Sequence, residues 1–152
     1  MNRRLGTLSL ALGVLLLATP VALHAQRAGV SRWHGQWTSP TGFLYIAELQ
    51  LEIRPDGAAE AAITWTLAHS PRETELPKLG QKGVEYVRGR YDVASGVLAL
   101  EGYRKEDPSG ILGLDTYRIL LAENGWALAG MTKNHGDWQG RFWATRVDRE
   151  RS

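Results

Sequence analysis

The sequence predicts an all-β domain of about eight antiparallel strands, connected as an up-and-down meander and closed, or nearly closed, into a small barrel. Three observations lead to this prediction. No window has the 3.6-residue apolar period of an amphipathic helix, whereas apolar and polar residues alternate over Phe43 to Ile53. Glycine-containing turns separate the apolar runs. A closed barrel leaves no sheet edge exposed, and a two-sheet sandwich or an open rolled sheet is the alternative.

Each expected strand ends at a recognisable turn. The first strand, 33–38, ends at 39–42, and the second, 43–53, ends at 54–57, where Pro55 presets φ and Gly57 allows a positive φ. Asn124-Gly125 is a strong hairpin signal between two later strands. The remaining strands are expected at 58–68, 84–93, 97–103, 114–122, 126–133 and 138–147.

The connections between these strands are unequal in length, and in a meander they alternate between the two ends. The turns at 54–57, 94–96 and 123–125 are short and share one end. The other end receives the connections at 39–42, 70–82, 104–113 and 134–137, two of which are long. Because binding residues favour loops on a rigid scaffold and the mouths of barrels, we expect the site at the end with the long connections.

The first 25 residues have the pattern of a secretory signal peptide. Arg3 and Arg4 precede the apolar run 8–18, Pro20 follows it, and small residues lead to Ala25. We therefore expect residues 1–25 to be a cleaved leader and 26–32 a lead-in. The single barrel domain is expected at 33–147 and a charged tail at 148–152, with the mature protein periplasmic or secreted. An uncleaved membrane anchor is the alternative, and Pro20 and the shortness of the apolar run argue against it.

Charge and cysteine content exclude several classes of function. Removing 25 residues from 152 leaves 127, enough for one core, and removing two arginines leaves 16 basic against 16 acidic side chains. This zero net charge gives no support for nucleic-acid binding. The chain has no cysteine, which excludes disulfides, thiol chemistry and a lipoprotein anchor. Charged residues on the expected outward faces argue against an outer-membrane barrel, so we do not expect an integral membrane protein after processing.

Six tryptophans provide candidate ligand-contacting surfaces. Trp and Tyr combine an apolar ring with a polar group and can stack on rings or sugars, although most are expected to fill the barrel. Trp33, Trp37 and Trp138 flank the expected long-loop end. We predict that Trp37, Tyr45 and Trp65 line the wall of a binding site, with Asp115 and His135 orienting polar atoms of the ligand.

No motif for catalysis or for cofactor binding is present. The chain has no Gly-x-Ser-x-Gly element, no phosphate-binding loop and no closely spaced histidine pair, so we expect no catalytic residue, metal or other cofactor. His69, Asp115, His135 and Asp137 could hold a metal only if several loops met. A hydrolase that uses Asp115, His135 and Asp137 remains an alternative that requires these groups to lie within hydrogen-bond reach.

Two short stretches resemble calycin-type barrels, the group that includes lipocalins and avidins. Residues 33–37, with the sequence WHGQW, are similar to the start of the first calycin strand. Residues 86–92, with the sequence YVRGRYD, look like a mid-barrel strand of the avidins. The resemblance implies a calycin-like barrel, but the polar residues that would hold biotin are not matched one by one.

The sequence therefore predicts a non-catalytic, periplasmic or secreted binding domain. Its expected partner is a small apolar, ring-bearing or sugar ligand held at the long-loop end. The first alternative is an envelope protein–protein interaction module, which exposed aromatic residues on a convex surface would favour. The second alternative is the hydrolase described above.

Overall fold

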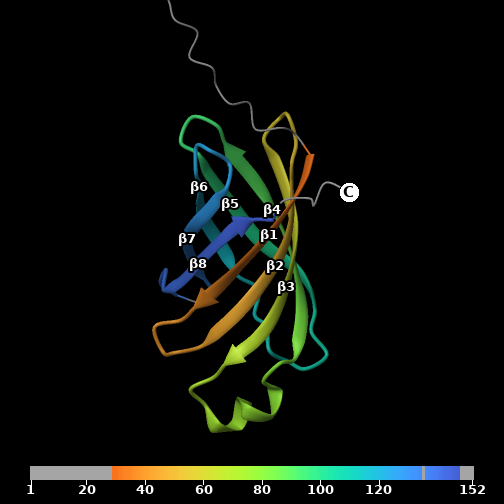
Figure 1. Cartoon of the computed structure of the whole chain (residues 1–152), viewed down its shortest axis with the longest axis vertical. Helices are drawn as coiled ribbons and strands as arrows, with labels where there is room; N and C mark the ends of the chain where they lie inside the picture. Colours follow the sequence, from red (N-terminus) through yellow and green to blue (C-terminus); the bar gives the residue numbers. More distant parts are fainter. Residues whose placement is uncertain (1–28, 135, 148–152) are drawn as a thin grey trace, which may run out of the picture.

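The computed structural model describes residues 29–134 and 136–147, which form a closed barrel of eight antiparallel strands (Figure 1). The expected leader and charged tail lie outside the described residues. A six-residue 3-10 helix, η1 (Glu73–Lys78), precedes the fourth strand. The strands are β1 (Gly29–Thr38), β2 (Leu44–Ile53), β3 (Ala58–His69), β4 (Lys82–Asp92), β5 (Val97–Glu106), β6 (Thr116–Leu121), β7 (Ala127–Lys133) and β8 (Gly140–Arg146).

Each strand pairs with its neighbours in the sequence, and β1 closes the barrel by pairing with β8. In that closing ladder Trp33 is opposite Arg146 and Thr38 is opposite Arg141. The predicted up-and-down barrel is confirmed, and the sandwich and the open sheet are excluded. Closure pairs every strand on both sides, so no strand of the barrel is left as an edge.

The strand boundaries differ from the prediction at several places. β1 begins at Gly29, four residues before the expected start, and pairs there with Ile53. β5 continues to Glu106 because a register shift between Tyr86 and Val87 keeps its end paired with β4. Strand bulges of this kind add one residue to one partner and preserve the ladder beyond it. The expected connection at 104–113 is therefore the loop 107–115.

The long and short connections segregate to opposite ends of the barrel, as predicted (Figure 1). We call the end with the connections 39–43, 70–81, 107–115 and 134–139 the long-loop end. The short-turn end has the connections 54–57, 93–96 and 122–126.

The half of the barrel nearer the short-turn end is filled by side chains. Trp33, Leu51, Ile63, Leu98 and Leu128 are almost completely buried there. Trp33 was expected near the long-loop end, and that expectation is wrong. β1 runs from the short-turn end towards the long-loop end. Trp33 precedes Trp37 by four residues, so it lies nearer the short-turn end and joins the core.

Two of the six tryptophans do not fill the barrel but lie on its outside. Trp126 and Trp143 are each 46% exposed. Strand alternation gives the reason, because Phe142 and Ala144 point inward on β8 and Trp143 between them must point outward. Among the described residues, no helix is long and apolar enough to cross a membrane.

Candidate functional site

A cavity of about 330 Å³ opens at the long-loop end, above the filled half of the barrel. This volume is at the small end of the range for small-molecule sites. Its described lining residues come from the strands and from three of the four long connections: Trp37, Ser39, Pro40, Thr41, Phe43, Tyr45, Trp65, Glu85, Ile111, Leu112, Gly113, Asp115, Tyr117, Thr132, Lys133, Asn134, Asp137, Gln139 and Gly140. The connection that carries η1, which was expected to frame the site, contributes no residue to this set.

Aromatic rings form one wall of the cavity. Trp37, Tyr45 and Trp65 come from β1, β2 and β3, and successive rings meet edge to face with centroids 5.7 and 6.2 Å apart. The series continues from Trp65 to Phe142 at 5.9 Å. These contacts fix each ring against its neighbours, so the wall is preformed rather than assembled by a ligand.

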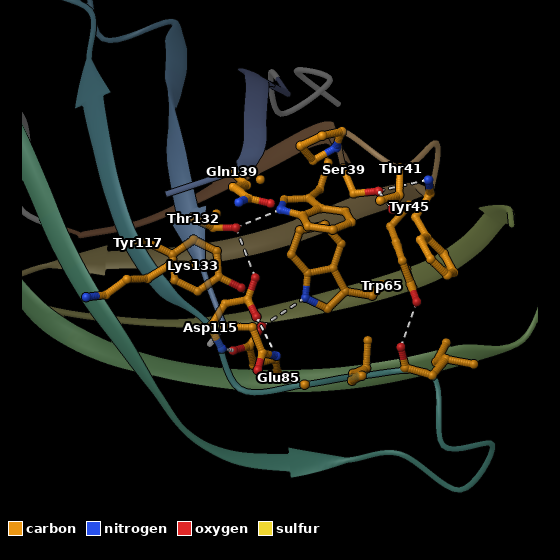
Figure 2. A pocket seen from close by; sticks show the side chains of 18 of the residues that line it. Ser39, Thr41, Tyr45, Trp65, Glu85, Asp115, Tyr117, Thr132, Lys133 and Gln139 are labelled. Atoms are coloured by element: carbon orange, nitrogen blue, oxygen red, sulfur yellow. Dashed lines mark hydrogen bonds between the residues drawn. The ribbon is translucent and has the colours of Figure 1, made fainter. Parts of the chain in front are cut away.

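The floor of the cavity contains a buried carboxyl group, Glu85 of β4 (Figure 2). Oε2 accepts hydrogen bonds from Trp65 Nε1, at 3.2 Å, and from the hydroxyl of Tyr117. Oε1 accepts the backbone N–H of Asp115 at 2.8 Å. All three donors are neutral, so they satisfy the oxygen atoms without supplying a balancing charge.

The surroundings of Glu85 disfavour its charge. Burial is the main cause and raises the pKa of Glu85 from 4.5 to about 7, the nearby Asp115 carboxylate adds to the increase, and the three donated hydrogen bonds oppose it. Burial also holds the pKa of the Tyr117 hydroxyl well above 10, with Glu85 and Asp115 as further causes. Near neutral pH, Glu85 therefore exchanges between its protonated and ionised forms.

Gly102 of β5 makes the space that the Glu85 carboxyl occupies. A Cβ atom at Gly102 would overlap Oε1 of Glu85 and would lie 3.2 Å from the backbone N and O of Asp115. The backbone N–H of Gly102 donates to the carbonyl of Asp115 at 2.8 Å. A residue without a side chain thus lets Glu85 and the start of β6 approach β5 closely.

A chain of hydrogen bonds connects the aromatic wall to a second carboxylate. Trp37 Nε1 donates to Thr132 Oγ1 at 2.7 Å, and Thr132 Oγ1 donates to Asp115 Oδ2 at 3.0 Å (Figure 2). Asn134 Nδ2 donates to the other oxygen, Oδ1, at 3.1 Å. Asp115 is half-buried, and through its backbone N–H it also touches Glu85. The two carboxyl groups therefore belong to one hydrogen-bonded unit.

The loop 107–115 is held in place over the cavity by polar contacts. Tyr45 donates its hydroxyl hydrogen to the carbonyl of Ile111 at 2.7 Å. Asp107 accepts the backbone N–H groups of Ile111 and Leu112, each at 2.8 Å. Burial opposes ionisation of Asp107, but these hydrogen bonds and Lys105 outweigh it and hold its pKa below 3.8.

Two further charged side chains line the cavity. Lys133 Nζ lies 5.2 Å from the centre of the Trp138 ring, and Figure 2 shows this ammonium directed away from Tyr45 and Trp65. Asp137 lines the cavity from the exposed connection between β7 and β8.

The structure brings four of the five predicted ligand-contacting residues to this one cavity: Trp37, Tyr45, Trp65 and Asp115. The fifth, His135, lies outside the described residues. Of the hydrolase set, Asp115 and Asp137 both line the cavity, and His135 is the remaining member. In the described part of the chain, no group of three or more His, Asp or Glu side chains is placed to hold a metal ion.

Sequence reasoning missed Glu85, Tyr117 and Thr132. Alternation in β4 contained the signal for Glu85, because Glu85 has the same parity as the inward-facing Val87 and Tyr91. The partners of Glu85 come from β3, β6 and the loop before β6, so no local pattern could reveal them.

Comparisons with family models, with curated proteins and with solved structures find no match for this chain.

Proposed function

We propose that this protein is a non-catalytic binding domain for a small ring-bearing ligand, held in the cavity at the long-loop end. The supporting observation is the pairing within one preformed cavity of an aromatic wall with a carboxyl floor. Apolar walls with a few convergent polar groups are typical of small-molecule sites.

Each part of the cavity has a role in this proposal. Trp37 and Trp65 contact the ring, because indole groups provide a large apolar area that loses little conformational entropy. Asp115 accepts hydrogen bonds from the ligand and orients it, and the buried Glu85 holds the Asp115 backbone N–H. The loop 107–115, held by Tyr45, covers one side of the cavity. Sugars remain within the proposed ligand class, because aromatic faces and carboxylates also suit them.

The indole N–H groups allow a direct test of this function. The protein is titrated with a library of ring-bearing, aliphatic and sugar fragments while the indole ¹H–¹⁵N signals of Trp37, Trp65 and Trp143 are followed. We expect ring-bearing fragments to shift the Trp37 and Trp65 signals. Trp143 is the matched control, because it lies on the outer wall.

The variant Trp37→Ala should weaken such binding, and Trp143→Ala should leave it unchanged. The proposal is overturned if no fragment shifts Trp37 or Trp65, or if Trp143→Ala weakens binding as strongly as Trp37→Ala.

A second candidate function, protein–protein interaction in the envelope, is favoured by a separate observation on the outer wall. Leu120, Ala129 and Trp143 are direct cross-strand neighbours on β6, β7 and β8, and all three are exposed. We call them the outer-wall row. A continuous exposed apolar row of this kind is typical of an interaction surface.

Photocrosslinking tests this second function. A photoreactive residue at position 143 should capture one protein partner in cells, and the same residue at Thr64, on the outer face of β3, should not. Leu120→Glu should abolish the crosslink at 143. Equal crosslinking at both positions would exclude the outer-wall row as a specific surface.

We also propose that residues 1–25 are removed on export, that the mature protein is periplasmic or secreted, and that the barrel is of the calycin type. The leader pattern and the two calycin-like stretches support this. The intact mass of the protein from an envelope fraction tests the cleavage: a chain beginning at Gln26 is expected, and a full-length chain would contradict it.

A further inference from the structure

The carboxyl groups at the floor of the cavity suggest a more specific ligand class than a ring alone. Glu85 occupies an inward position between Gly83 and Val87, at which an apolar residue would pack without a desolvation cost. The three hydrogen bonds that it receives and the space left by Gly102 show that the local structure accommodates this carboxyl. Buried ionisable groups beneath a cavity are frequent at functional sites.

The carboxylate of Asp115 is more exposed than that of Glu85 and therefore has a different role. Asp115 is half-buried and lines the cavity, so a ligand can reach it, whereas Glu85 is only 2% exposed. Glu85 touches Asp115 through the Asp115 backbone N–H. When it is ionised, Glu85 thus adds a second negative charge near the carboxylate that a ligand would contact.

The aromatic wall, like the two carboxyl groups, favours a positively charged ligand. The faces of Trp and Tyr rings attract cations, and the attraction grows when water is excluded. Trp37 is tied to Asp115 through Thr132, so the ring and the carboxylate keep a fixed relation. Lys133, the basic side chain among the described lining residues, is directed away from the wall and stacks on Trp138.

We infer that the cavity binds a ring-bearing ligand with a protonated amine, whose ammonium group donates hydrogen bonds to Asp115 and is further stabilised by the charge of Glu85. This inference rests on the proposed function and narrows its ligand class from any ring-bearing molecule to a ring-bearing molecule with a protonated aliphatic amine. Glu85 is a positioning residue in this arrangement, since it acts through Asp115 and through its charge.

Proton release follows from the same geometry. Without ligand, Glu85 is partly protonated near neutral pH, because burial and Asp115 both disfavour its charge. A bound ammonium group favours the ionised form, so binding expels the Glu85 proton to solvent and becomes tighter as the pH rises to about 7, above which the affinity is level. An aliphatic amine stays protonated over this range, because its pKa is close to that of lysine, about 10.4.

Other titratable groups face Glu85 or line the cavity above it. Tyr117 faces it from β6 and Asp115 from the loop before β6, while Trp65 of β3 and the backbone of Gly102 are neutral. Lys133 and Asp137 line the upper part of the cavity. Burial holds the pKa of the Tyr117 hydroxyl well above 10, so this group stays protonated between pH 6 and pH 8, a window of about one unit on each side of the Glu85 value.

The experiment compares three molecules that share one ring and differ in charge: tryptamine, tryptophol and indole-3-propionate. Affinities are measured by calorimetry at about pH 8, with the Trp37 and Trp65 indole signals confirming the site. We expect tryptamine to bind about tenfold more tightly than tryptophol, as one charge-assisted hydrogen bond provides, and indole-3-propionate to bind most weakly.

Two variants separate the contributions of the carboxyl groups. Asp115→Asn should remove most of the tryptamine preference at every pH. Glu85→Gln should keep a smaller preference but abolish both its pH dependence and the proton release. The proton release is measured by repeating the calorimetry at about pH 6.5, below the Glu85 pKa, in buffers of different ionisation enthalpy. If Glu85 had only a structural role, Glu85→Gln would not abolish the proton release in a protein that still folds.

Failure of this inference is distinguishable from failure of the proposed function. If ring-bearing fragments shift Trp37 and Trp65 but tryptamine has no advantage over tryptophol, the cationic ligand class is wrong and the binding function stands. If binding releases no proton and is independent of pH, the role assigned to Glu85 is overturned. If no fragment in the wider library shifts these signals, both proposals are overturned.

Discussion

The indole N–H of Trp65 donates a hydrogen bond to Oε2 of Glu85 at 3.2 Å and thereby connects the aromatic wall of the cavity to its carboxyl floor. Trp65 also contacts Tyr45 and Phe142 edge to face, so one side chain belongs to both the core and the site. Substitutions at the floor should therefore change stability as well as binding, and the predictions below use matched variants to separate the two.

Glu85 should make the protein less stable as the pH rises from about 4.5 to about 7. Its pKa is higher in the folded protein than in the unfolded chain, so in this window the folded state holds a proton that the unfolded state has lost. The shift corresponds to about 3 kcal/mol of lost unfolding free energy, complete above pH 7. Urea unfolding at several pH values measures it.

The matched variant for this prediction is Glu85→Gln, which keeps the shape but cannot ionise. Its unfolding free energy should lack the fall between pH 4.5 and 7 that the unmodified protein shows, so the difference between the two proteins should change by about 3 kcal/mol. Parallel pH profiles would show that Glu85 does not titrate in this range.

Gly102→Ala should destabilise the protein by about 1–3 kcal/mol, since its Cβ atom would overlap the Glu85 carboxyl and crowd Asp115. The double variant Gly102→Ala, Glu85→Ala removes the overlapping carboxyl. We expect the cost of Gly102→Ala to be clearly smaller in the Glu85→Ala background, as coupled neighbours require. Additive costs in chemical denaturation would indicate that the clash lies elsewhere.

Thr132→Val should cost about 1–3 kcal/mol, although valine has nearly the same shape. Thr132 is fully buried, and loss of its hydroxyl leaves Trp37 Nε1 without an acceptor and Asp115 Oδ2 without this donor. Thr132→Ser keeps the hydroxyl and is the control. The Trp37 indole N–H should exchange faster with deuterium in the valine variant than in the serine variant, and equal rates would contradict the hydrogen-bond chain.

Asp107→Asn should loosen the loop over the cavity. Asp107 accepts the backbone N–H groups of Ile111 and Leu112, and a neutral amide gives weaker hydrogen bonds than a carboxylate. Hydrogen exchange at these two amides should accelerate, with a loss of about 1 kcal/mol in stability. Glu106→Gln is the control, because Glu106 binds Arg104 and Tyr86 instead; it should leave both amides protected.

Patterns of alternation and turns predicted most of the fold, because both are local properties of the chain. The inward parity of Tyr45 to Ile53 and the turn at 54–57 follow from side-chain period and backbone preference. The start of β1 at Gly29 was missed because a polar, glycine-containing segment becomes a strand there by pairing with β2. The extra length of β5 likewise depends on a bulge opposite Tyr86 and Val87.

Part of the candidate site was also predicted, because alternation and the lengths of the connections are local properties of the chain. Trp37, Tyr45 and Trp65 were identifiable as large inward-facing residues near long connections, and Asp115 as a polar residue beside them. Glu85 was not selected, because an isolated glutamate in a strand usually faces solvent and its three donors come from other elements.

The sequence by itself determined the strand order, the segregation of short and long connections and the inward faces of β2 and β3, since these depend on residues close together in the chain. Only the tertiary structure decided that Trp33 fills the core, that Trp143 faces outward and that Glu85 and Asp115 share one floor. The physical reason is barrel closure: pairing of β1 with β8 and the register of all eight strands set which distant side chains meet.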